Sequence, residues 1–138
     1  MSLKNYKKPD LTLREARAMA AKAFALAPKE IRSLPGDRSQ NFLIQTESAR
    51  KYVLKISSSF DHLEELDFEN KVILRLSQKL SDYRFPLPQP DISGQYINIY
   101  KRQNEIFYLR LFDYLEGLSL ADLESVPLSL WSEIGSLL

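Results

Sequence analysis

The sequence has 138 residues, with 19 Lys and Arg against 18 Asp and Glu, a net charge of +1, no Cys and one His. Without cysteine there is no disulfide framework, no thiolate zinc site and no cysteine nucleophile. One histidine excludes metal motifs that need two. The balanced charge gives no footprint for nucleic acid, and no apolar run approaches the ~20 residues of a membrane span. Since the first residues lack the apolar core of a signal peptide, we expect a cytoplasmic protein of one domain.

The first predicted element is a helix. Residues 1–10 are polar and basic, which is typical of a flexible tail. Thr12 and Glu15 then stand at the spacing of a capping box, in which each side chain satisfies a free amide at a helix start. The Ala-rich run 16–26 favours helix, and Pro28 ends it.

The following residues predict an antiparallel sheet interrupted by one long helix. Short polar connections between apolar runs favour hairpins, and Asp61 is well placed to cap the long helix. Each proline in the stretch 85–90 disfavours helix for the residue before it. The expected elements are strands 30–34, 41–46 and 51–56, helix 61–80, strands 91–100 and 105–113, a linker at 115–117, and helical pieces at 119–124 and 127–138. This order predicts an α+β fold with a five-stranded antiparallel sheet.

A lysine inside a strand is the first indication of chemistry. Lys55 shares a strand face with Val53, so it either reaches solvent at a sheet edge or meets a partner. On the long helix, Glu69 falls between Leu66 and Ile73 on the apolar stripe, or at its solvent-facing margin. An inward carboxylate needs a cation, because an unpaired buried charge is very costly. Lys55 and Glu69 are therefore candidates for an inward ion pair.

Three sequence runs carry a family resemblance. They are L-P-G-D-R-S-Q-N-F at 34–42, K-Y-V-L-K-I at 51–56 and R-L-F-D-Y-L-E-G at 110–117. With the helix glutamate, they resemble the smaller lobe of kinase-like folds, and most closely the hydroxylysine-kinase-like branch of the aminoglycoside phosphotransferase family. The resemblance covers residues 11–138. It implies a nucleotide-binding N-terminal lobe at 11–117 and the start of a truncated second lobe at 118–138.

The resemblance implies ATP as the cofactor. Lys55 would hold the α- and β-phosphates, and Glu69 would orient Lys55. The loop 36–40 would cover the phosphates, and backbone groups of residues 112–115 would bind the adenine edge. The residues implied in nucleotide binding are Leu34, Ser39, Gln40, Asn41, Val53, Lys55, Glu69, Phe112, Asp113, Tyr114 and Leu115. Mg²⁺ is expected with ATP, but no residue of this chain is assigned to it.

The family's catalytic run, His-x-Asp, has no counterpart in this sequence. The one histidine, His62, lies at the start of the long helix and is expected at the surface. We therefore expect the ATP-binding lobe of a small-molecule phosphotransferase, which transfers the ATP γ-phosphate to a hydroxyl, with no catalytic residue and no activity of its own.

The alternative is a non-catalytic, kinase-like interaction module. Residues 128–138 place apolar side chains at helical spacing, which favours either self-association or packing back onto the lobe. The expected partners are accordingly a nucleotide and either a second copy of the chain, forming a homodimer, or a separate C-terminal lobe.

Overall fold

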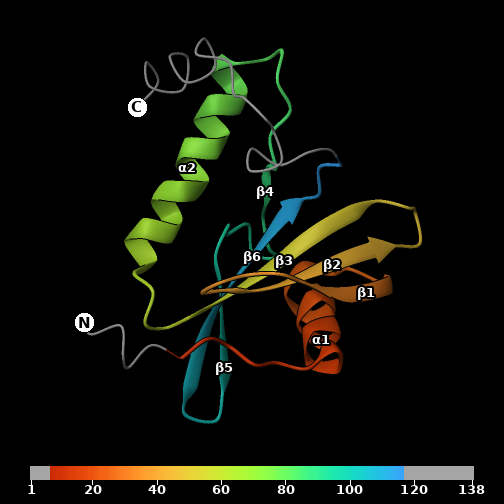
Figure 1. Ribbon diagram of the computed structural model, residues 1–138, viewed down its shortest axis with the longest axis vertical. Helices are drawn as coiled ribbons and strands as arrows, with labels where there is room; N and C mark the ends of the chain where they lie inside the picture. Colours follow the sequence, from red (N-terminus) through yellow and green to blue (C-terminus); the bar gives the residue numbers. More distant parts are fainter. Residues whose placement is uncertain (1–6, 117–138) are drawn as a thin grey trace.

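The computed structural model describes residues 7–116. Its elements are α1 (Leu13–Phe24), β1 (Pro28–Leu34), β2 (Gln40–Thr46), β3 (Lys51–Ser58), α2 (Leu63–Lys79), β4 (Pro88–Gln89), β5 (Asn98–Arg102) and β6 (Glu105–Asp113). Within these residues the strands form one six-stranded antiparallel sheet in the order β1-β2-β3-β6-β4, with β5 also paired to β6 (Figure 1). The predicted α+β class is confirmed, with six strands in place of five.

The first helix begins at the predicted capping box. The backbone N–H of Glu15 donates to Thr12 Oγ1 at 3.1 Å, and the backbone N–H of Thr12 donates to Glu15 Oε1 at 3.2 Å. The helix ends one turn of chain before Pro28, because Ala25 adopts a left-handed conformation with φ of 54°. Pro28 is already the first residue of β1, so the strand starts earlier than the predicted run 30–34.

The core lies on one face of the sheet. Successive side chains on a strand alternate between its faces, and on β3 the buried apolar ones are Tyr52, Leu54 and Ile56. The same apolar cluster includes Ala16, Met19, Ala20, Ala23, Phe24, Phe42, Ile44, Phe107, Leu109 and Leu111. Figure 1 shows α1 close against the sheet and α2 standing away from α1. Since α2 buries only Leu66 and Asn70, the other face of the sheet is left partly open.

The start of the long helix differs from the prediction. The residue before α2 is His62, whose side chain makes no capping hydrogen bond. The predicted cap, Asp61, instead forms an ion pair with Arg38 at 3.0 Å. The cation that attracts this carboxylate comes from a distant loop, so local spacing could not reveal it.

Within the proline-rich stretch, Pro88 and Gln89 form the short strand β4 against Phe112 and Leu111 of β6. No strand was expected in this stretch. A proline has no N–H to donate, but an edge strand tolerates it because one side of the strand needs no partner.

The predicted strand 91–100 is shortened by a turn around Asp91. Its carboxylate accepts hydrogen bonds from Ser93 N (2.9 Å), Ser93 Oγ (2.7 Å), Gln95 N (2.9 Å) and Asn98 Nδ2 (2.9 Å). Burial disfavours the charged form, but the hydrogen bonds from Asn98, Ser93 and Gln95 outweigh it and hold the Asp91 pKa below its usual value. This turn occupies the chain up to β5, so the strand begins only at Asn98.

Several sequence-based expectations fall outside the described residues. They concern the helical pieces at 119–124 and 127–138, the second-lobe segment 118–138, the apolar self-association face, and residues 1–6 of the expected tail. In the described part of that tail, Pro9 is buried and Lys8 Nζ donates to the carbonyl oxygen of Gly36. Neither described helix has the length and apolar character needed to cross a membrane.

Candidate functional site

The open face of the sheet carries two adjacent rows of side chains. One row is polar: Asn41 of β2 lies opposite Lys55 of β3, which lies opposite Arg110 of β6. The next row is apolar and includes Val53 opposite Phe112. Since residues two apart on a strand share a face, both rows point away from the core beneath α1. The antiparallel register thus sets a flat apolar surface directly beside a cationic one.

A polar pocket of about 440 Å³ opens over the polar row. It is lined by Gly36, Asp37, Arg38, Ser39, Asn41, Lys55, Ser57, Asp61, Glu65, Leu66, Glu69 and Arg110. Asn41 fixes the loop above it, because Asn41 Nδ2 donates to the Pro35 carbonyl at 2.9 Å and Asn41 Oδ1 accepts from Ser39 Oγ at 3.1 Å. Gly36 suits this tight loop, since a Cβ there would lie closer than 3.0 Å to the Ser39 carbonyl oxygen and to Asn41 Nδ2.

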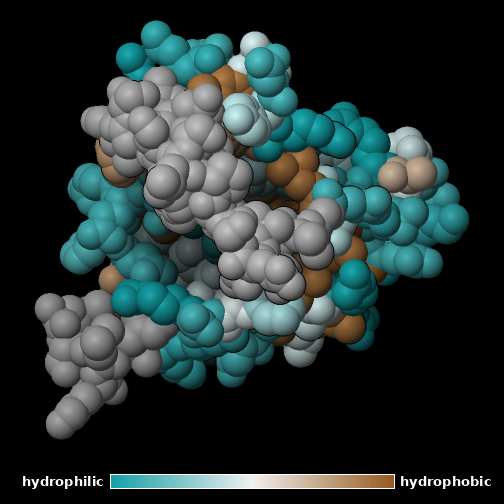
Figure 2. All heavy atoms as spheres, turned by 45° about the horizontal axis from the view of Figure 1, so that its top comes forward, coloured by the Kyte–Doolittle hydropathy of each residue, from teal (hydrophilic) through white to brown (hydrophobic). Residues whose placement is uncertain are grey.

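An apolar slot of about 390 Å³ adjoins the polar pocket. Its lining comprises Leu34, Pro35, Asn41, Val53, Lys55, Glu69, Ile73, Pro86, Arg110, Phe112, Asp113, Tyr114 and Leu115. Asn41, Lys55, Glu69 and Arg110 line both spaces, so the two form one continuous cleft. In the space-filling view, apolar surface gathers near the centre of one face and is bordered by hydrophilic surface (Figure 2).

Residues 112–115, here called the hinge, form the far wall of the slot. The backbone N–H of Asp113 donates to the Leu87 carbonyl at 2.9 Å, and that of Tyr114 donates to the Lys51 carbonyl at 3.1 Å. These two donors hold the hinge to the residue before β4 and to the first residue of β3. A flat base in the slot would therefore be read by hinge groups other than these two N–H groups.

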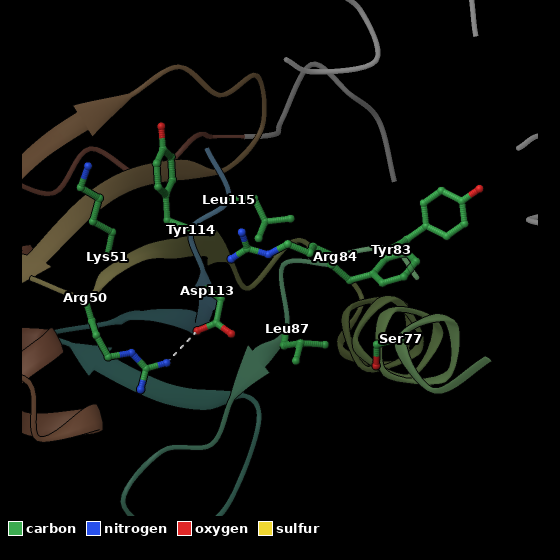
Figure 3. A pocket seen from close by; sticks show the side chains of 10 residues that line it. Arg50, Lys51, Ser77, Tyr83, Arg84, Leu87, Asp113, Tyr114 and Leu115 are labelled. Carbon is green, nitrogen blue, oxygen red and sulfur yellow. Dashed lines mark ion pairs between the residues drawn. The ribbon is translucent and has the colours of Figure 1, made fainter. Parts of the chain in front are cut away.

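A third hollow, of about 520 Å³, adjoins the same hinge residues (Figure 3). Figure 3 shows the side chain of Arg84 extending towards Tyr114 and Leu115. Two other cations of this hollow already have carboxylate partners: Arg50 Nη2 lies 3.5 Å from Asp113 Oδ1, and Lys51 Nζ lies 2.8 Å from Glu116 Oε1. The Lys51–Glu116 bond raises the pKa of the lysine and lowers that of the glutamate. Arg50 and Lys51 of this hollow are thus already paired with carboxylates.

Lys55 lies in an electrostatically unfavourable place. It is half-buried on an interior strand, with β2 on one side and β6 on the other, so the edge-strand interpretation of the sequence was wrong. Burial lowers the pKa of Lys55, the neighbouring Arg110 lowers it further, and Glu69 partly opposes both. Within residues 7–116 no ion pair joins Lys55 to a carboxylate at 4.0 Å or less. The ammonium group is thus poised for an external anion.

The expected Lys55–Glu69 pair is replaced by a pair between Glu69 and Arg110. Arg110 Nη1 lies 2.9 Å from Glu69 Oε2, and the side chains are 3% and 57% exposed, respectively. Glu69 therefore lies at the margin of the cleft, not inside the apolar stripe. Sequence reasoning assigned no role to Arg110. The available signal was a charged residue within the otherwise apolar run Leu109–Phe112.

The structure brings all of the sequence-predicted site residues except Gln40 to one or both parts of the cleft. The Gln40 amide instead forms two hydrogen bonds with the backbone of Leu11: Leu11 N donates to Gln40 Oε1 at 2.8 Å, and Gln40 Nε2 donates to the Leu11 carbonyl at 2.7 Å. Gln40 thus ties the end of the loop to the segment before α1. In the part of the chain that the structure describes, no group of three or more acidic or histidine side chains could hold a metal ion.

An antiparallel sheet with a half-buried lysine facing a cleft, a helix glutamate across from it and a hinge beyond defines a kinase-like α+β fold. Residues 30–138 match the family model described as the phosphotransferase enzyme family, APH. The chain belongs to this family. Among curated proteins, no significant match to the sequence was found.

Three solved structures with a similar fold are named as kinases or a phosphotransferase. Amicoumacin kinase hAmiN, in complex with AMP-PNP, Ca²⁺ and Ami, has a TM-score of 0.66 and 19% identity, over 81% of this chain and 34% of that one. The microcompartment-associated aminopropanol kinase has a TM-score of 0.64 and 12% identity, over 80% of this chain and 34% of that one. Spectinomycin phosphotransferase APH(9)-Ia, in complex with ADP and spectinomycin, has a TM-score of 0.61 and 10% identity, over 91% of this chain and 42% of that one. At these identities the likeness concerns the fold, and this chain spans 34–42% of the length of these structures.

Proposed function

We propose that residues 11–117 form the ATP-binding lobe of a small-molecule phosphotransferase. The adenine ring would occupy the apolar slot between Leu34, Val53 and Phe112, with the hinge at its edge. The phosphates would lie in the polar pocket, under the loop fixed by Asn41. The observation that carries the proposal is the strand register of β2, β3 and β6. This register sets the polar row beside the apolar row, so that an apolar surface adjoins the unneutralised ammonium of Lys55.

The reaction served by this lobe would be transfer of the ATP γ-phosphate to a hydroxyl. Positioning and charge neutralisation supply most of the catalysis in such reactions, so a lysine aimed at the phosphates is a principal contribution of this lobe. Two of the similar structures contain AMP-PNP or ADP, which supports an adenine nucleotide. Mg²⁺ would accompany the nucleotide, with ligands other than the described residues.

The finer assignments belong to the same proposal. The acceptor would be a small molecule, because the similar structures are named as kinases of amicoumacin and aminopropanol and as a spectinomycin phosphotransferase. The sequence runs at 34–42 and 51–56 favour the hydroxylysine-kinase-like branch. A cytoplasmic location, where ATP is available, is part of the proposal.

The test is titration of the full chain with a fluorescent ATP analogue. Lys55→Met should weaken binding about 10- to 100-fold, because a hydrogen bond to a charged group contributes about 1.5–3 kcal/mol. Lys22→Met is the matched control, since Lys22 lies exposed on α1, beyond the other face of the sheet. Adenosine and tripolyphosphate should each compete with the analogue, more weakly than ATP. Unchanged binding by the Lys55 variant, or an equal loss in the control, would contradict the proposal.

A further inference from the structure

The polar row places two cations directly opposite each other. Lys55 and Arg110 are register partners on β3 and β6, and both line the two parts of the cleft. Like charges at directly opposite positions of an antiparallel pair destabilise it. One carboxylate, Glu69, lies near both cations, so its choice of partner decides which cation is left for a ligand.

Among residues 7–116, the side-chain hydrogen bonds of Arg110 all lead to α2. Arg110 Nη1 donates to Glu69 Oε2 at 2.9 Å, and lies 3.4 Å from both the Leu66 carbonyl and Asn70 Oδ1. The guanidinium carbon also stands 5.3 Å from the ring centre of Phe112, within the range of a cation–π contact. A planar guanidinium can serve several acceptors at once, which the compact ammonium of lysine does less well.

The helix has few other attachments to the sheet. Among the described residues, Leu66 and Asn70 are the only buried residues of α2, and both contact Arg110. Removing Arg110 would therefore leave Glu69 without its partner and weaken the attachment of α2 to the sheet. The negative charge of Glu69 raises the pKa of Lys55, but Lys55 has no ion pair of its own among residues 7–116.

We propose that Arg110 anchors Glu69 and α2 over the cleft, which leaves the ammonium of Lys55 free for the nucleotide phosphates. Arg110 is in this sense a positioning residue. The arrangement differs from the pairing implied by the family resemblance, in which Glu69 orients Lys55. The inference rests on the proposed function, because it assigns Lys55 to the phosphates of that same site.

The test is a pair of double-mutant cycles on the full chain without nucleotide, read by urea unfolding. Glu69→Gln is combined with Arg110→Met in one cycle and with Lys55→Met in the other. Alone, Glu69→Gln should raise the unfolding equilibrium constant about 3- to 10-fold, a modest coupling because the glutamate is half exposed. The effect should vanish once Arg110 is replaced and persist in full once Lys55 is replaced. A larger coupling of Glu69 to Lys55 than to Arg110 would overturn the proposal.

A second measurement covers the case in which Arg110→Met does not fold. An NMR titration follows the Lys55 side chain in the wild type and in Glu69→Gln. If Glu69 serves Arg110, the pKa of Lys55 should fall by less than about half a pH unit on this substitution, whereas loss of a direct partner should lower it by about one unit or more. A fall of the larger size would overturn the proposal.

Nucleotide titration separates this inference from the proposed function. If Lys55→Met leaves ATP-analogue affinity unchanged, the phosphate assignment fails while the cycles still report which cation Glu69 anchors. If Lys55→Met abolishes binding but Glu69 couples to Lys55 and not to Arg110, the proposed function stands and the anchoring inference fails.

Discussion

Gln40 offers the sharpest distinction between a structural and a ligand-binding role in the loop. The sequence resemblance places its side chain with the phosphate-binding residues, whereas in the structure the amide binds the backbone of Leu11 on both sides. Gln40→Ala removes both hydrogen bonds at once. It leaves the N–H and carbonyl of Leu11, a residue only 3% exposed, without these partners.

The magnitude follows from those two groups. A hydrogen bond contributes about 1 kcal/mol net, and a buried group left unpaired costs about 1–3 kcal/mol. Some water will reach this part-buried site, so we expect a loss of about 2–3 kcal/mol in the free energy of unfolding. For a domain of this size that corresponds to a fall in Tm of roughly 10 °C.

The assay is urea unfolding followed by circular dichroism, which should show a lower midpoint at an unchanged m-value. Gln78→Ala is the matched control, because Gln78 is exposed on α2 and a surface substitution changes stability by about 0.5 kcal/mol or less. Affinity for the ATP analogue should change far less than in Lys55→Met. Normal stability of Gln40→Ala together with a tenfold loss of nucleotide affinity would refute this reasoning and return Gln40 to the phosphates.

Two further outcomes are expected. Asp91→Asn should destabilise the fold by about 1–3 kcal/mol, since an amide cannot accept all the hydrogen bonds that the carboxylate accepts. Because the folded pKa of Asp91 lies below its usual 3.8, wild-type stability from this group is present above that value and lost as pH falls towards and below the folded pKa. The free energy of unfolding, measured from pH 2 to 6, should therefore depend less on pH for Asp91→Asn than for the wild type. An equal pH dependence of the two proteins would contradict this. Gly36→Ala should force the loop outward and weaken nucleotide binding about tenfold, because the added Cβ meets backbone oxygen and the Asn41 amide. Binding equal to wild type would show that the loop shifts without consequence, and Ser81→Ala, at an exposed position, is the control.

The elements that were predicted well are those whose signals are local. The capping box of Thr12 and Glu15 needs only four consecutive residues, and both bonds are present. The strand with Lys55 and the strand ending at Asp113 follow from short runs of apolar and aromatic residues bounded by polar turns. By contrast, β4 contains two residues and exists only through its pairing with β6, so no periodicity could announce it.

The sequence by itself determined the α+β class, the order of the elements other than β4 and the chemical types along the cleft, because these depend on apolar runs, capping and turn residues close in the chain. Only the tertiary structure decided which polar side chains form ion pairs and hydrogen bonds with one another. Glu69 binds Arg110, which lies 41 residues away in the sequence, and Gln40 binds Leu11, which lies 29 residues away. Asp61 binds Arg38, 23 residues away, and does not cap the helix. Charged and amide groups take the best partner that folding brings within reach, and the register of β3 against β6 sets that choice for the cleft.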